Sequence, residues 1–290
     1  MISYIIVIYV LAYVLQFVGI KMAKRPDNPD PQGRPSRKLL ALVMAIPSIV
    51  LIVFVFLGQV PPNWSDFGLT MPSFAHWVLG FFTPIIYMTI MFAILKPFSK
   101  VDKIEVTSDG KWHIPGVNTI FNGFIKKEKR TNIKKPVVYI LDFLVSTLVL
   151  SLMSLVFALG EELAWRGFMQ PIFIERFGVA LGITLLGIVW GFWHFPLNVV
   201  GYNDAKNPKL NAFILFTIQT IALSFIFGWL RITTGNIWAA SLAHAAHNVS
   251  EGVGRIFIIP RIGNVKYRII ETAVYVLFGA IAFVLIHMGV

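Results

Sequence analysis

Seven ionisable or amide side chains interrupt three long apolar runs, at places where a lipid bilayer would surround them: Glu161, Glu162, Arg166, His194, His244, His247 and Asn248. A charged side chain at the centre of a bilayer costs about 2.5–3.5 kcal/mol, so such residues normally face the interior of a helix bundle and mark function. Carboxylates and imidazoles can exchange protons, and imidazole and amide N–H groups can stabilise a developing oxyanion. We therefore take these seven residues as the candidate site.

Helical spacing gives the two adjacent glutamates different roles. Glu162 and Arg166 are four residues apart with the acid first, the favoured order for an ion pair within a helix. We expect this pair to neutralise itself and to stabilise its helix. Glu161 points about 100° away from Glu162 and has no basic residue three or four positions later. It therefore needs a partner from another helix.

His194 is the expected partner of Glu161 because the two residues should lie at the same depth. Residues 176–178 (Arg-Phe-Gly) resemble the turn of an antiparallel helical hairpin. Glu161 lies about 16 residues before this turn and His194 about 16 after it, which places both roughly 24 Å from the turn. Gly187 and Gly191 lie on the His194 side of their helix and favour close helix packing. The alternative is that His194 is a structural hydrogen-bond partner.

A second hairpin, with its turn at 231–236, brings the remaining polar residues into the bundle. His244 and Asn248 are four residues apart, so they project from one helix face and can donate to a common point. His247 is three residues from His244 and could share the same cavity. The alternative is that His244 and Asn248 form hydrogen bonds between helices.

These groups together predict hydrolysis of an amide by an activated water inside the membrane. A glutamate removed from water is a stronger base, and His194 could share the proton that Glu161 takes from the water. His244 and Asn248 could then donate to the tetrahedral oxyanion. The chain has no cysteine, which excludes disulfides, a cysteine nucleophile and cysteine-ligated zinc.

Three motifs in this order on successive predicted helices resemble the CPBP family, which comprises type II CAAX prenyl endopeptidases and bacteriocin-processing or immunity proteins. The motifs are EExxxR (Glu161, Glu162, Arg166), an aromatic-xxx-His (Trp190, His194) and HxxxN (His244, Asn248). The resemblance covers roughly residues 140–250.

The resemblance implies an intramembrane glutamate protease built from eight helices that needs no cofactor. The residues that match Glu161 and His194 would activate water, and those that match His244 and Asn248 would form the oxyanion hole. The supporting residues would be Glu162, Arg166, Trp190 and His247. The family commonly has Phe at the position of Trp190, and this difference bears on packing and hardly affects the resemblance.

The implied substrate is a prenylated CAAX protein, which would lose its C-terminal tripeptide while its isoprenoid lies between helices. A related membrane-bound substrate without a prenyl group remains open. One alternative is a zinc protease with Glu161, His194 and His244 as ligands and water in the fourth position. Another is a non-enzymatic transporter or bacteriocin-immunity scaffold that uses the polar cavity for binding.

Composition predicts an all-α polytopic membrane protein. Of 290 residues, 57% are hydrophobic and 13% charged, and the mean hydropathy is +0.74. Soluble domains are nearer to about 45–50% apolar. Eight segments are apolar enough to be transmembrane helices, the seventh being short: Ile2–Ile20, Leu39–Val60, Ala75–Leu95, Val137–Leu159, Val179–Val200, Ala212–Leu230, Ile237–Val249 and Ile269–Val290.

The net charge of +11 reflects orientation in the membrane. Its basic residues gather in short segments between the apolar runs, and with both termini outside, 22 of the 25 would lie in the cytoplasm. We therefore expect an integral multi-pass protein of the cell membrane in a prokaryote or of the endoplasmic reticulum in a eukaryote. Lipid and a peptide or prenylated protein are its expected partners, and nucleic acid is not.

Four regions follow from this pattern: N-terminal helices (1–96), a basic cytoplasmic insert (97–136), a catalytic core (137–250), and a basic loop with a final helix (251–290). Within the insert, the alternation around Asp109-Gly110 predicts a β-hairpin. A basic run at 126–130 is expected to contact anionic headgroups. A continuous helix over 137–177 would be about 60 Å long, so we expect either a break at Gly160 or a start in the membrane interface near Asp142.

Overall fold

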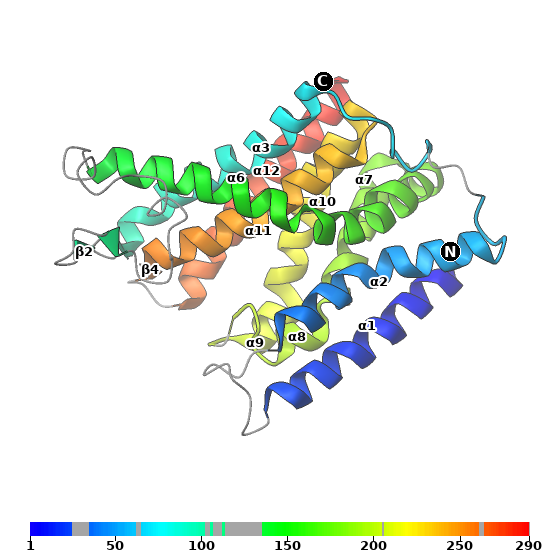
Figure 1. Ribbon diagram of the computed structural model, residues 1–290, viewed down its shortest axis with the longest axis horizontal. Helices are drawn as coiled ribbons and strands as arrows, with labels where there is room; N and C mark the ends of the chain where they lie inside the picture. The colour runs from blue at the N-terminus through cyan, green and yellow to red at the C-terminus, as the bar shows by residue number, and fades with distance from the viewer. Residues whose placement is uncertain are drawn as a thin grey trace.

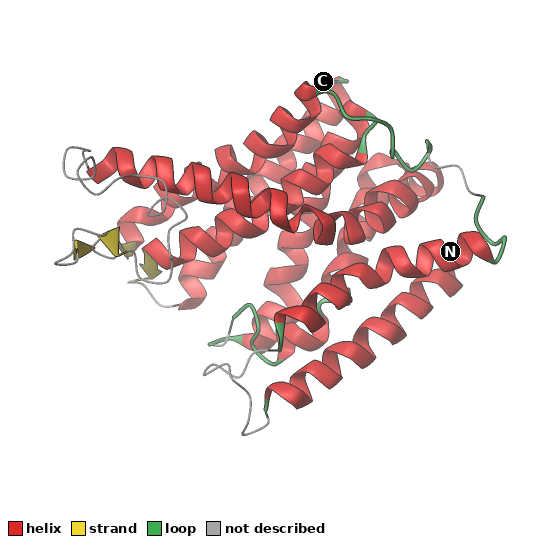
Figure 2. Ribbon diagram, in the orientation of Figure 1, coloured by secondary structure: helices red, strands yellow, loops and turns green. Residues whose placement is uncertain are grey.

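A computed structural model describes residues 1–24, 35–61, 65–101, 105–106, 112–113, 135–204, 206–260 and 264–289. Almost all of this is helix (Figure 2), which confirms the all-α prediction. The longer helices are α1 (Ile2–Ala23), α2 (Arg37–Phe56), α3 (Phe74–Leu95), α6 (Lys135–Glu162), α7 (Gln170–Trp193), α10 (Phe216–Thr234), α11 (Ile237–Phe257) and α12 (Asn264–Met288). The shorter elements are η1 (Lys96–Phe98), α8 (Phe195–Val199), α9 (Pro208–Leu210), the π-helical segments η2 (Leu163–Met169) and η3 (Asn211–Leu215), and four strands, β1 (Ser99–Val101), β2 (Glu105–Val106), β3 (Trp112–His113) and β4 (Ile258–Pro260).

Six helical runs in the described residues are long and apolar enough to cross a membrane, and the chain is an integral multi-pass membrane protein. The runs are Ile2–Ala23, Lys38–Phe56, Phe74–Phe98, Leu144–Trp193, Pro208–Thr234 and Asn264–Met288. The expected number was eight. One run has 50 residues and overlaps two of the predicted segments, Val137–Leu159 and Val179–Val200. The short predicted segment at 237–249 is the first part of α11, whose polar residues keep it out of the six.

Both predicted hairpin turns are confirmed, and each has a glycine with positive φ. Gly178 has φ 74° inside the 50-residue run, and Gly235 has φ 62° directly after α10. Only glycine adopts this region readily, so the chain can reverse at both places. A Cβ on Gly182 would lie 2.6 Å from the carbonyl oxygen of Phe173. The chain after Gly178 therefore packs directly on the chain before it.

The predicted break at Gly160 is wrong, because α6 runs through this residue to Glu162 and continues as η2. Gly160 instead lies where α2 packs closely against α6. The Ser48 hydroxyl donates to the Gly160 carbonyl oxygen at 2.6 Å, and a Cβ on Gly160 would lie 3.1 Å from the carbonyl oxygen of Met44. The alternative expectation, a start in the membrane interface near Asp142, concerns residues whose side chains lie outside the described part of the chain, and it stays a prediction.

Helices α1 and α2 form one group and the remaining long helices form another, and the two groups meet at the polar residues. Figure 1 shows α1 and α2 side by side in opposite directions along one flank of the molecule. α11 packs between α3 and α6, while α10 packs against α7 on one side and α12 on another. α2 also contacts α6, which joins the flanking pair to the rest of the bundle. The polar segments of α6, α7 and α11 therefore lie toward the interior.

The strands are short, and Figure 1 shows β2 and β4 at one end of the molecule. β2 pairs with β3 in antiparallel register, Glu105 opposite His113, which confirms the predicted hairpin. Its turn, residues 107–111, and the basic run at 126–130 lie outside the described residues. β1 pairs with β4 and ties the chain after α3 to the end of α11, a contact that the sequence did not predict.

Candidate active site

A cavity of about 440 Å³ contains all four residues that were predicted to do chemistry. Glu161, His194, His244 and Asn248 line it, and so does His247. Its volume falls in the range of about 300–1,000 Å³ that is usual for small-molecule sites. The predicted equal depth of Glu161 and His194 agrees with their position in this one cavity.

Glu161 is 1% exposed and accepts hydrogen bonds from two indole groups. Its Oε2 atom accepts from Trp190 Nε1 at 2.8 Å and from Trp165 Nε1 at 3.4 Å. The expectation that Glu161 lacks a partner on its own helical run is therefore wrong, because Trp165 is four residues away. Both donors are neutral, so the carboxylate is held without an ion pair to either of them.

Glu162 forms the predicted ion pair and also binds a histidine from another helix. Arg166 Nη1 lies 3.0 Å from Glu162 Oε1, and both side chains are fully buried. His244 Nδ1 lies 2.8 Å from the same oxygen. Because an ionised carboxylate can accept but not donate, His244 carries its proton on Nδ1, and Nε2 is the ring nitrogen left for another partner.

Arg166 has further contacts that fix its guanidinium in the bundle. Its Nη2 group donates to the Ser224 hydroxyl at 3.2 Å. Its Cζ atom lies 4.7 Å from the ring centroid of Trp190 and 5.3 Å from that of Phe227. The cation therefore contacts aromatic faces from α7 and α10, an arrangement that stabilises a desolvated charge.

His194 lies at the junction of α7 and α8. Its Nδ1 atom is 3.0 Å from the Trp190 carbonyl oxygen, which can only accept, so the proton is on Nδ1 and Nε2 is a free acceptor in the neutral ring. The ring packs edge-on against Trp193 and Phe216, with centroids 4.5 and 5.1 Å away. Trp190 thus contacts both proposed proton acceptors, Glu161 through its side chain and His194 through its backbone.

The polar face of α11 lines the cavity as its spacing predicted. His244 is 3% exposed, whereas Asn248, one turn later, is exposed at the cavity. His247 also lines the cavity, and its Nδ1 atom is hydrogen-bonded to the Tyr87 hydroxyl at 2.9 Å. His247 is therefore held by α3, which gives it a structural contact besides its place in the cavity.

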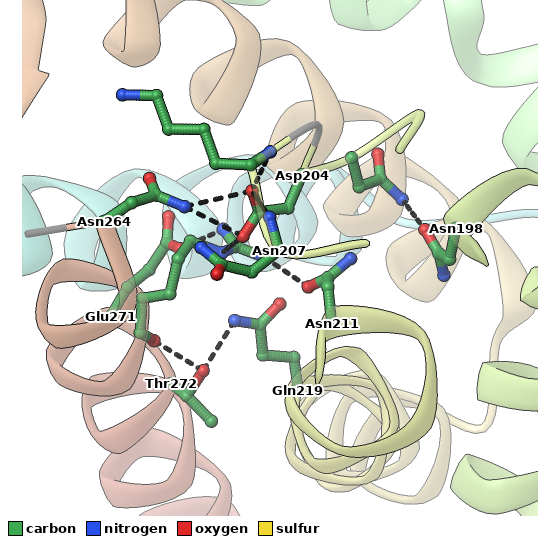
Figure 3. Close-up of polar contacts among 11 residues, drawn as sticks. Asn198, Asp204, Asn207, Asn211, Gln219, Asn264, Glu271 and Thr272 are labelled. Atoms are coloured by element: carbon green, nitrogen blue, oxygen red, sulfur yellow. Dashed lines mark hydrogen bonds and ion pairs between the residues drawn. The ribbon is translucent and has the colours of Figure 1, made fainter. Parts of the chain in front are cut away.

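A loop that was not among the predicted site residues also contributes to the cavity wall. Tyr202 and Asn203 line the cavity, and Asn203 donates from Nδ2 to Asn198 Oδ1 at 2.7 Å (Figure 3). Asp204 follows, and its Oδ1 atom accepts from the backbone N–H groups of residues 206 and 207 at 3.0 and 3.1 Å. An aspartate that accepts from the backbone two residues later is a recognisable turn signal, so Asp204 could have been identified.

The same loop is attached to α12 by buried polar contacts. Asn264 Nδ2 donates to both carboxylate oxygens of Asp204, at 3.0 and 3.1 Å (Figure 3). Arg268 pairs with Glu271 and donates from Nη2 to Asn211 Oδ1 at 2.9 Å. Arg268 is 3% exposed and lies within α12. Its charge therefore lies inside the bundle beside Glu271.

The zinc alternative requires a set of metal ligands. Across the part of the chain that the structure describes, no three His, Cys, Asp or Glu residues lie close enough together to hold a metal ion. The three residues named for this alternative, Glu161, His194 and His244, therefore do not form a ligand set.

The fold and the site define a multi-pass membrane protein with a cavity lined by glutamate, histidine and asparagine. Residues 143–250 match the family model described as "Type II CAAX prenyl endopeptidase Rce1-like". The chain is also 27% identical over 124 residues to "CAAX prenyl protease 2" of Methanococcus maripaludis. This match spans 41% of the chain and 43% of the relative's length. The matched region is similar to these endopeptidases, and it contains the three motifs that led us to expect the CPBP family.

Proposed function

We propose that this chain is an intramembrane endopeptidase that hydrolyses a peptide bond with a water activated by Glu161 and His194. The observation that carries the proposal is the meeting of Glu161, His194, His244 and Asn248 in one cavity, although they come from three separate helical segments. These four residues supply a base, a second acceptor and two groups able to donate to an oxyanion.

The geometry of Glu161 and His194 supports a single reaction sequence. Both hydrogen bonds to Glu161 use Oε2, so Oε1 is the atom that takes a proton from water. His194 Nε2 accepts a hydrogen bond from the same water and orients it. The water oxygen then bonds to the carbonyl carbon of the substrate and generates an oxyanion.

The second half of the reaction releases the two products. His244 and Asn248 donate to the oxyanion while it exists. When the intermediate collapses, the C–N bond breaks and Glu161 transfers its proton to the departing nitrogen. Because Nδ1 of His244 is bound to Glu162, its Nε2 atom is the one that donates to the oxyanion, which requires a proton on both ring nitrogens.

The proposed substrate is the C-terminal segment of a prenylated CAAX protein, from which the enzyme removes the last three residues. The family description and the printed name of the archaeal relative both support this substrate class. The cavity wall also supports it, because α2 contributes Leu40, Val43 and Met44 beside the polar groups. An apolar wall next to a hydrolytic centre suits a lipid-modified peptide.

The test compares cleavage by membranes that contain wild type, Glu161→Gln or His194→Ala. A farnesylated CAAX peptide and the same peptide without the farnesyl group are offered to each. We expect release of the tripeptide from the farnesylated peptide by wild type, and loss of about 10²–10⁴-fold in rate in either variant, the usual contribution of a general base. Cleavage that survives both substitutions would refute the mechanism.

Two further arms separate the other classes of function. Wild-type membranes are assayed after extensive treatment with a zinc chelator, and full activity is expected because the mechanism needs no metal. A chelator-sensitive activity that zinc restores would favour the zinc protease. A wild type that cleaves neither peptide, with function in a transport or immunity assay retained by Glu161→Gln, would favour the non-enzymatic scaffold.

A further inference from the structure

The backbone around His194 lacks part of the normal helical hydrogen bonding. α7 ends at Trp193 and α8 begins at Phe195, so the helix changes direction at His194. Pro196 has no N–H group, and the Phe192 carbonyl four residues earlier cannot receive the usual helical bond. A buried carbonyl without a donor is costly, so something else must supply one.

Three side chains of α1 bind this part of the backbone. The Tyr9 hydroxyl donates to the Val189 carbonyl at 2.6 Å, and the Tyr13 hydroxyl donates to the Phe192 carbonyl at 2.7 Å. The second contact replaces the bond that Pro196 cannot make. Gln16 is the third residue, and it stands on the same helix face because positions 9, 13 and 16 are separated by four and three residues.

Gln16 bridges the two helices on either side of His194. Its Nε2 group donates to the Trp193 carbonyl at 2.8 Å, and its Oε1 atom accepts from the Leu197 N–H at 3.3 Å. In a continuous helix, this N–H and this carbonyl would bind each other. The Gln16 amide takes the place of that bond. It is 1% exposed and lines the cavity, so the bridge is built into the site.

We propose that α1 is a positioning element for the reaction, with Gln16 as its main residue, because it holds the backbone that carries the His194 ring. The inference rests on the proposed peptidase function, since His194 matters as the partner of Glu161 at the activated water. α1 lies outside residues 143–250, the part that matches the family model. The site of this chain is therefore completed by a helix from beyond its family core.

The first experiment measures kinetics of cleavage of the farnesylated peptide. We expect Gln16→Leu, and separately the double variant Tyr9→Phe/Tyr13→Phe, to lower kcat by on the order of 10–100-fold with little change in KM, because small displacements of a reacting group have effects of this size. Tyr4→Phe is the matched control. The Tyr4 hydroxyl lies on the same helix but donates to the Pro47 carbonyl of α2 at 2.8 Å.

The second experiment reports the position of residue 194 without any catalysis. The chain has no cysteine, so His194→Cys introduces a single thiol whose rate of labelling by a small water-soluble thiol reagent can be measured. We expect Tyr9→Phe/Tyr13→Phe to change this rate several-fold in the His194→Cys background, and Tyr4→Phe to leave it unchanged. Neither Tyr9 nor Tyr13 is among the described residues that line the cavity, so a change reports the backbone at 194.

The outcomes separate the two proposals. Full kcat in both test variants, an equal loss in Tyr4→Phe, or an unchanged labelling rate in Tyr9→Phe/Tyr13→Phe would overturn the positioning role. A wild type that cleaves no peptide overturns the peptidase proposal instead, and the labelling experiment then decides by itself whether α1 positions residue 194. Thermal unfolding of each variant in detergent is measured alongside, and similar melting temperatures are expected for the three tyrosine variants.

Discussion

The indole of Trp190 donates a 2.8 Å hydrogen bond to Glu161 across a separation of 29 residues. The same ring lies under the guanidinium of Arg166, whose Cζ atom is 4.7 Å from its centroid. Trp190 therefore contacts the carboxylate of one motif glutamate and the cation that neutralises the other. The sequence suggested that a Trp in place of the commoner Phe bears on packing, and the structure shows that its N–H group also contacts Glu161.

Replacing Trp190 by Phe should weaken catalysis without unfolding the site. The variant keeps an aromatic face for Arg166 but removes the donor to Glu161 Oε2. Hydrogen bonds to charged groups contribute about 1.5–3 kcal/mol, so we expect kcat/KM for the farnesylated peptide to fall about 10–100-fold. Trp165→Phe is the matched control, because its donor lies 3.4 Å from the same oxygen and should matter less. An equal or larger loss in Trp165→Phe would contradict this ranking.

Breaking the Glu162–Arg166 pair should destabilise the protein strongly. Glu162→Gln leaves the buried guanidinium without a counter-charge, and removal of one partner of a buried ion pair typically costs about 3–5 kcal/mol. Thermal unfolding in detergent micelles measures the effect. The double variant Glu162→Gln/Arg166→Met should be nearer to wild type in stability, since neither charge remains, yet it should stay inactive because His244 has lost its carboxylate partner. A double variant as unstable as the sum of the two single changes would count against the pairing.

Asn248 should contribute to the reaction rate and little to stability. It is exposed at the cavity, so its truncation leaves no large gap in the core. We expect Asn248→Ala to lower kcat by about 10²–10³-fold, the usual effect of removing one oxyanion donor, with KM nearly unchanged. Ser241→Ala, on the same helix, is the control, because the Ser241 hydroxyl donates to the backbone of its own helix at 2.9 Å. Normal kcat in Asn248→Ala would remove Asn248 from the mechanism.

Gly187 should tolerate no side chain, since α10 lies against it. A Cβ there would lie 2.5 Å from the Ile221 Cα, so Gly187→Ala must push the two helices apart, and we expect a loss of stability of about 1–3 kcal/mol. Gly252→Ala makes a useful comparison, because a Cβ at Gly252 meets nothing within 4 Å. Alanine favours helix over glycine by about 0.5–1 kcal/mol, so this variant should be slightly more stable. Equal melting temperatures for the two variants would show that α7 and α10 do not approach each other so closely at Gly187.

Local periodicity explains which features the sequence predicted correctly. The Glu162–Arg166 pair, the common face of His244 and Asn248, and the turns at Gly178 and Gly235 all follow from 3.6 residues per turn and from the special backbone of glycine. These contacts involve neighbours within one helix or one turn. The shared cavity of Glu161 and His194 was also predictable, because a hairpin with a known turn sets the depth of every residue along its two legs.

Contacts between helices depended on the tertiary structure. The bond between His244 and Glu162 joins residues 82 apart, and the bond between Gln16 and the Trp193 carbonyl joins residues 177 apart. Helical periodicity shows which residues of one helix share a face. It does not show which face of a neighbouring helix lies opposite, because the facing surfaces depend on the rotation and tilt of each helix in the bundle. Arg268 is a further example, because the sequence does not show that packing of α12 buries this charge against Glu271. The sequence alone therefore determined the helices, their turns and the residues available for chemistry. The tertiary structure decided which of those residues contact each other, because each contact depends on the rotation of at least two helices about their axes.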